Sequence, residues 1–170
     1  MKLKAVCCAA LLGMLVSPAL ADIMITATPD YQVTSIGGTA TVDIYADIPE
    51  ADAIVGFGFD ANPDGFVSLT GFDVNLALFS AAAGPDGDGI GGLVFPPDTV
   101  WGDGVYLGTL SYVGDSMGLA TIQMSDSYPD DLTEGFALDG SGFAPVVYGA
   151  FEIYVPEPSA LLLLALGGLV

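Results

Sequence analysis

Apolar and polar residues alternate over residues 39–48, and this alternation limits the folds open to the chain more than any other feature. A period of two belongs to an extended strand, whose successive side chains point to opposite faces. One face of this segment is entirely apolar and carries Val42, Ile44, Ala46 and Ile48. The segment therefore predicts a β-strand with one buried face.

Similar short segments follow one another along the chain, with Gly, Pro, Asp and Asn between them every 8 to 12 positions. These residue types favour turns. Before residue 160 only residues 75–83 offer a short helical stretch. The pattern predicts an all-β fold, an antiparallel β-sandwich or jelly roll of about nine strands. Besides 39–48, the expected strands include residues 23–29, 31–36, 54–60, 66–75, 105–113, 119–125 and 146–155.

The first 21 residues have the layout of a secretory signal peptide. Lys2 and Lys4 precede an apolar stretch, and small residues at Ala19 and Ala21 suit a signal peptidase. The apolar stretch is shorter than the roughly 20 residues that a membrane-spanning helix needs. We therefore expect a signal helix over residues 1–21, its removal by signal peptidase after Ala21, and export of the rest.

Lys2 and Lys4 are the only basic residues, while all 21 acidic residues lie at or beyond Asp22. The exported part would have no Lys, Arg or His and no side-chain salt bridge. Nucleic acid is excluded as a partner, because phosphate binding depends on Lys and Arg, and anionic membranes are disfavoured for the same reason. Two interpretations of the charge stay open: a solubility coat for a salty habitat, or binding of divalent cations.

The C-terminal segment reads Val-Pro-Glu-Pro-Ser over residues 155–159 and continues with eleven apolar residues. The motif Pro156, Glu157 and Pro158 before a Leu run resembles the sorting tail of PEP-CTERM proteins. The resemblance implies that the apolar run forms a helix and that exosortase, a membrane protease-transpeptidase, recognises the tail. It also implies a protein of the cell envelope, transiently anchored in the membrane and associated with exopolysaccharide.

The tail departs from that family in one respect, since it stops at Val170 without a cluster of arginines. Eleven helical residues rise only about 16 Å, roughly half a bilayer core. Either the sequence is truncated or the signal is degenerate. A C-terminal strand packed on the domain is the less favoured alternative, because Leu and Ala favour helix. The expected organisation is a signal peptide at 1–21, a β-sandwich domain at 22–154 and a sorting tail at 155–170.

The order of features in the middle of the chain is similar to that of cohesin-like domains of exported proteins. A Thr- and Val-rich strand precedes Gly56-Phe57-Gly58-Phe59-Asp60, a looped or helical crossing follows at residues 76–79, and an aromatic strand at 146–154 closes the domain. The resemblance implies a cohesin-like β-sandwich. It does not imply that a dockerin is the partner.

Asp86 and Asp88 lie in a glycine-rich loop and are the strongest candidates for a metal site. Carboxylates two residues apart can converge on one cation, and Ca²⁺ prefers six to eight oxygen ligands. The alternative is a solvated turn. Two weaker acidic groups, which are explained first as turns, are Asp60 with Asp64 and Asp126 with Asp130 and Asp131.

Catalysis is not expected, because the chain beyond residue 21 has no His, Cys or Lys to act as a nucleophile or base. Trp101, the only tryptophan, is a candidate for sugar stacking, with loop packing as the alternative. Three hypotheses remain. The first is a structural or exopolysaccharide-associated envelope protein. The second is a surface module that binds carbohydrate or another surface protein, with Ca²⁺ as a cofactor. The third, an enzyme that uses carboxylates alone, is the least favoured.

Overall fold

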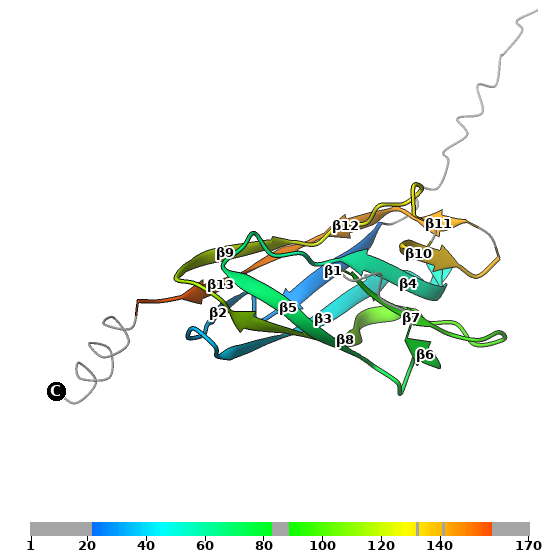
Figure 1. The fold of residues 1–170 in the computed structure, drawn as a ribbon. Coiled ribbons are helices and arrows are strands. Elements are labelled where there is room, and N and C mark those ends of the chain that lie inside the picture. The colour runs from blue at the N-terminus through cyan, green and yellow to red at the C-terminus, as the bar shows by residue number, and fades with distance from the viewer. Residues whose placement is uncertain (1–21, 83–88, 132, 141, 158–170) are drawn as a thin grey trace, which may run out of the picture.

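The computed structural model describes residues 22–82, 89–131, 133–140 and 142–157 (Figure 1). These residues form thirteen strands and one short 3₁₀ turn, η1 (Glu50–Asp52). The all-β class predicted from the sequence is confirmed. The predicted signal helix and the apolar tail lie outside the described residues. No helix among the described residues is long and apolar enough to cross a bilayer.

The strands form three sheets, two of five strands and one of three. The first sheet has the order β12–β1–β3–β8–β5, with β12 (Val146–Tyr148), β1 (Ile23–Thr28), β3 (Thr39–Ile48), β8 (Gly102–Gly114) and β5 (Val67–Val74). The second has the order β11–β10–β4–β7–β6, with β11 (Phe143–Ala144), β10 (Gly135–Leu138), β4 (Ile54–Asp60), β7 (Gly89–Leu93) and β6 (Ala81–Ala82). The third has the order β2–β13–β9, with β2 (Tyr31–Val33), β13 (Ala150–Val155) and β9 (Gly118–Gln123).

The second and third sheets are joined into one layer of a sandwich. Two isolated bridges connect them, Asp60 with Ser125 and Pro63 with Ile122. The backbone N–H of Asp60 donates to the carbonyl of Ser125 at 2.7 Å, and the N–H of Ser125 donates back at 3.2 Å. The first sheet forms the opposite layer (Figure 1).

The two ends of the described chain pass together from one layer to the other. In the first sheet β1 pairs in parallel with β12, and in the third sheet β2 pairs in parallel with β13. The crossing occurs at Gly149, whose N–H donates to the carbonyl of Ile25 at 2.9 Å. A Cβ at Gly149 would lie 2.8 Å from that carbonyl oxygen, so glycine is needed for this close approach.

One continuous core lies between the layers and takes side chains from all three sheets. The predicted apolar face of β3 is confirmed, since Val42, Ile44, Ala46 and Ile48 are all buried. Phe57 packs on Phe79 and Phe136 with ring centroids 4.8 and 5.7 Å apart. Tyr112 is fully buried, and its hydroxyl donates to the carbonyl of Ala61 at 2.8 Å.

The structure differs from the sequence prediction in the strands of the C-terminal segment, in the direction of their pairing and in the number of strands. The expected strand 146–155 is two strands in different layers, β12 and β13. The pairs β1–β12 and β2–β13 are parallel, because both chain segments run in the same direction across the sandwich. The crossing at residues 76–79, expected to be looped or helical, is looped: residues 76–78 form a turn closed by hydrogen bonds from Leu78 and Phe79 to the carbonyl of Asn75. β6, β7, β10 and β11 were not predicted.

We expect Gly58→Ala to destabilise the fold by about 1–3 kcal/mol, because the new Cβ has no room. That Cβ would lie 2.3 Å from the backbone oxygen of Thr133. The matched control is Gly71→Ala in β5, where no described heavy atom lies within 4 Å of the new Cβ. Its free energy of unfolding should change by less than about 0.5 kcal/mol. Urea unfolding of both variants measures the difference, and equal effects would contradict this account of the glycine.

Candidate binding site

The outer face of β4 is made of glycine. Phe57 and Phe59 point into the core, so the alternation of the strand places Gly56 and Gly58 on the opposite face. Gly56 pairs with Ala137 of β10 and with Leu93 of β7, and Gly58 pairs with Gly135 and Gly91. The centre of the second sheet therefore has almost no side chains on its outer surface.

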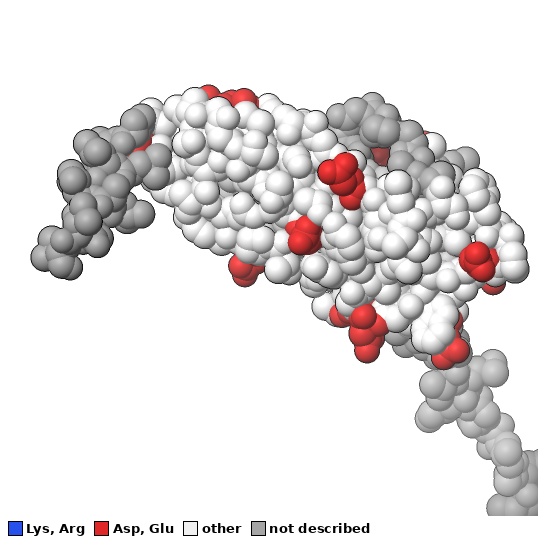
Figure 2. Space-filling view, turned by 90° about the horizontal axis from the view of Figure 1, so that it is seen from below, with Lys and Arg blue, Asp and Glu red and all other residues white. Residues whose placement is uncertain are grey.

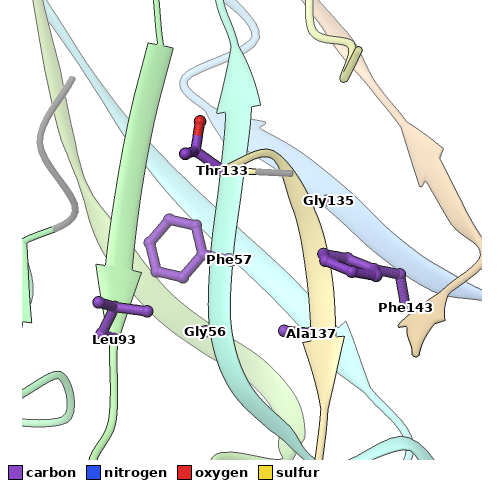
Figure 3. Close-up of a pocket in the computed structure, with 7 residues that line it drawn as sticks. All are labelled: Gly56, Phe57, Leu93, Thr133, Gly135, Ala137 and Phe143. Atoms are coloured by element: carbon purple, nitrogen blue, oxygen red, sulfur yellow. The ribbon is translucent and has the colours of Figure 1, made fainter. Parts of the chain in front are cut away.

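This bare strip forms the floor of a pocket of about 240 Å³ (Figure 3). Its lining residues are Gly56, Phe57, Leu93, Thr133, Gly135, Ala137 and Phe143. The walls stand close to the floor. A Cβ at Gly56 would lie 2.8 Å from the Leu93 side chain, and a Cβ at Gly135 would lie 2.8 Å from the Phe143 ring. The pocket exists because glycine leaves room on both strands.

The pocket has an apolar rim, which we define as Leu93, Phe143 and Tyr128. Leu93 on β7 is 42% exposed and Tyr128 is 40% exposed. The rings of Tyr128 and Phe143 are stacked, with centroids 4.0 Å apart. Exposed aromatic side chains beside a hollow are typical of the central contacts of protein interfaces.

A negative charge lies beside one wall of the pocket. The carboxylate of Asp131 accepts hydrogen bonds from the hydroxyl of Thr133 at 2.7 Å and from its backbone N–H at 2.8 Å. These bonds hold the pKa of Asp131 below its ordinary value. The lining itself contains no charged residue. The site therefore offers an apolar hollow with one fixed carboxylate next to it.

A second polar group surrounds the hydroxyl of Tyr148, which donates to Asp126 at 2.6 Å. Asp60 and Glu134 are near enough to act on the same hydroxyl electrostatically. Glu134 is buried and accepts a hydrogen bond from the backbone N–H of Ser127. Burial raises the pKa of Tyr148, and the hydrogen bond and charge of Asp126 raise it further. Tyr148 therefore stays protonated and acts as a donor to Asp126.

The acidic residues singled out in the sequence are arranged differently from expectation. Asp60 and Asp126, assigned to separate turns, both lie near Tyr148. Asp64 instead accepts the backbone N–H of Thr121 at 3.1 Å, and Asp131 is bonded to Thr133. No group of three or more His, Cys, Asp or Glu in the described part of the chain is arranged to hold a metal.

The other predicted site residues divide into two groups. Trp101 lies next to β8 and is 53% exposed, with no aromatic ring of the described residues packed on it. Pro156 is buried and Glu157 is exposed. The remaining residues lie outside the described ranges: Ala19, Ala21, Asp86, Asp88 and Pro158. Calcium binding at Asp86 and Asp88 and sugar binding at Trp101 stay predictions.

The pocket was not predicted from the sequence. The alternation of Gly56 and Gly58 with two phenylalanines was visible, and it indicated a strand with one small face. Other lining side chains come from segments that are distant in the sequence: Leu93, Thr133 and Phe143. No local sequence pattern predicts that they lie together. The single available signal was a glycine pair on the outer face of a strand with a bulky inner face.

Comparison with known proteins identifies the architecture. A chain from the crystal structure of a complex between CaCohA2 of Clostridium acetobutylicum and a CaDoc0917 variant matches with a TM-score of 0.59 at 13% identity, over 78% of this chain and 99% of that chain. The cohesin module of a family 33 glycoside hydrolase from Clostridium perfringens matches with a TM-score of 0.56 at 10% identity, over 80% and 96% of the two chains. A non-cellulosomal cohesin from the archaeon Archaeoglobus fulgidus matches with a TM-score of 0.50 at 14% identity, over 84% and 97%.

No family model and no curated protein sequence matches the chain. At these identities the structural matches show the fold alone. The cohesin-like β-sandwich expected from the sequence is confirmed.

We expect stability to fall above about pH 10, where tyrosines of an unfolded chain ionise. Burial raises the pKa of both Tyr112 and Tyr148 in the folded chain, so the folded state keeps protons that the unfolded state loses. The contribution of these two tyrosines to the free energy of unfolding is then constant below pH 10 and falls above it, by about 1.4 kcal/mol per pH unit for each tyrosine.

Urea unfolding at a series of pH values from about 9 to about 11.5, the range in which tyrosines of an unfolded chain ionise, measures this slope. Tyr112→Phe should reduce the slope, whereas Tyr31→Phe, at a position 48% exposed, should leave it unchanged. An identical slope in both variants and in the parent chain would disprove the assignment.

Proposed function

We propose that this chain is an exported surface module that binds another protein through the outer face of its second sheet. The pocket between β4, β7 and β10 carries this proposal (Figure 3). Its volume of about 240 Å³ is below the roughly 300–1,000 Å³ of pockets that enclose drug-sized ligands. It suits one apolar side chain, held between Leu93 and the Phe143 ring.

The chemistry of the pocket favours binding over catalysis. Its lining residues supply no carboxylate, and Thr133 supplies the only polar side chain. The carboxylate-only enzyme considered from the sequence would need two acidic residues facing each other across a cleft. Asp60, Asp126 and Glu134 instead surround the hydroxyl of Tyr148, which donates to Asp126. We therefore propose a binding role for the pocket.

Charge sets the chemistry of the partner. The described residues contain no Lys, Arg or His, and carboxylates are spread over the visible surface in Figure 2 without a basic residue between them. A partner with positive charge gains from electrostatic complementarity with this acidic domain. We propose that it inserts an apolar side chain into the pocket and places a Lys or Arg against Asp131.

Two further observations support the proposal. One matched chain belongs to a complex of CaCohA2 with a CaDoc0917 variant, so a chain of similar fold occurs in a two-component assembly. The signal peptide and the PEP-CTERM-like tail, both assigned from the sequence, would bring the module to the cell envelope. The structural or exopolysaccharide-associated role also expected from the sequence stays a prediction, with no feature of the described fold that favours it over protein binding.

The test compares two substitutions to aspartate at exposed apolar positions. Leu93 forms a wall of the pocket, whereas Phe95, which is 61% exposed, is not among the lining residues. We expect the full chain to bind an envelope protein of the source bacterium, purified after retention on the immobilised chain. Leu93→Asp should weaken that binding by roughly 30-fold or more, and Phe95→Asp by less than about threefold.

Isothermal titration of the purified partner against each variant gives the affinities. Equal loss in both variants would place the binding surface elsewhere. If the immobilised chain instead retains a polysaccharide, and Trp101→Ala abolishes that binding, the result would support the sugar-binding alternative.

The calcium prediction needs its own test, because Asp86 and Asp88 lie outside the described residues. We expect micromolar Ca²⁺ to raise the melting temperature of the full chain where NaCl of matched ionic strength does not, on the order of a few degrees. Asp86→Asn with Asp88→Asn should abolish the calcium effect. A rise that follows ionic strength alone would identify the acidic residues as a solubility coat.

A further inference from the structure

The outer face of the third sheet carries a row of exposed apolar side chains. Tyr154 of β13 pairs with Val33 of β2 on one side and with Leu119 of β9 on the other. Their exposed fractions are 36%, 53% and 42%. All three point outward, because the neighbouring residues of β13, Ile153 and Val155, are buried in the core. The row therefore crosses all three strands of the sheet.

Two more exposed apolar residues lie at the same end of the sandwich. Ile36 is 52% exposed and forms a bridge with Gly114, at the end of β8. Met117 is 48% exposed and precedes Gly118, which pairs with Val155. We call Val33, Ile36, Met117, Leu119 and Tyr154 the tail-end patch. It contains no charged side chain.

The polarity of the face changes along the strands. The row next to Tyr154 consists of Tyr31, Glu152 and Thr121, which are paired across the same three strands. Glu152 is half-buried and supplies the first carboxylate on this face. The following β9 residue on this face is Gln123. The part of this face without a carboxylate thus lies at the end of the domain where the described chain leaves β13 (Figure 1), and the exposed Tyr31 belongs to the row that contains Glu152.

The chain leaves the domain directly beside this patch. β13 ends at Val155, Pro156 is buried, and Glu157 is exposed. The sequence then reaches an uninterrupted apolar run at Ala160. Three residues of chain span at most about 10 Å. If the apolar run enters a lipid bilayer, the tail-end patch is held within that distance of the bilayer surface.

We propose that the tail-end patch rests on a bilayer surface with zwitterionic headgroups when residues 160–170 enter that bilayer. Aliphatic side chains of this kind bury shallowly in the interfacial region, and tyrosine is favoured there because it has an apolar ring and a polar hydroxyl. Anionic headgroups are disfavoured, since the domain has no Lys or Arg to attract them. This orientation turns the opposite end of the sandwich toward the surroundings.

The opposite end provides an internal control. Trp101 precedes Gly102, which pairs with the last residue of β3, Ile48, whereas the tail end holds the first residues of β3. Trp101 is 53% exposed, more than Tyr154. If exposure alone attracted lipid, Trp101 would contact the bilayer as readily as the patch does.

The experiment uses the full chain reconstituted into phosphatidylcholine vesicles with and without brominated acyl chains, which quench tryptophan on contact. The parent chain reports on Trp101. The variant Trp101→Phe with Tyr154→Trp reports on the patch, and Trp101→Phe with Leu119→Trp repeats the measurement should the first variant fail to fold by circular dichroism. We expect brominated lipid to remove most of the emission at position 154 or 119 and to leave that of Trp101 unchanged.

Several results would overturn the proposal. The first is equal quenching of the tryptophan at both ends of the domain. The second is a chain that sediments with the vesicles but shows no quenching at position 154 or 119. The third is failure of the chain to sediment with the vesicles. A blue shift of the tryptophan emission at position 154 in the absence of vesicles would show that another part of the chain covers the tail-end patch. A blue shift that grows with the ratio of protein to lipid, without quenching by bromine, would identify a second copy as the occupant.

Discussion

The absence of any side-chain cation beyond Lys4 is the constraint on which the rest of the structure depends. No carboxylate in the described residues can form an ion pair with a basic side chain. Carboxylates that are partly shielded from water therefore accept hydrogen bonds from N–H groups or hydroxyls. Asp47 accepts the N–H of Gly104 at 2.7 Å, and Glu134 accepts that of Ser127. Asp52 is an exception, because it is buried and one of its oxygens has no hydrogen-bond partner among the described residues. Stability must therefore come from the core and the backbone ladders, since charge opposes the compact state.

The same dependence on the core explains the pocket. β4 places phenylalanines on its inner face, where Phe57 lies between Phe79 and Phe136, and glycines on its outer face. The glycines allow the segment at Thr133 and the Leu93 side chain to approach the strand more closely than any Cβ would permit. A hollow lined by backbone and apolar groups results on the outer face of the second sheet. This hollow, with Asp131 beside it, supports the proposal of a partner that has an apolar anchor and a basic group.

The parts of the fold that depend on local pattern were predictable, and those that depend on distant pairing were not. The bounds of β3 and β4 follow from their alternation and agree with the structure. The split of residues 146–155 at Gly149 is set by parallel pairing with β1 and β2, more than a hundred residues earlier, so local sequence does not reveal it. β10 and β11 have four and two residues, too few for a periodic signal. The pocket combines Leu93 with Phe143, and Tyr148 gathers acidic residues from separate turns, so neither site has a sequence motif.

The central claim is that a protein partner binds the outer face of the second sheet. Amide hydrogen exchange of the full chain, with and without its purified partner, tests this claim directly, because it reports protection strand by strand. The account predicts slower exchange on binding in β7, β10 and the segment 126–131, with no change in β5 or in the outer positions of β3. Protection confined to the loop around Trp101, or to the outer face of the first sheet, would contradict it.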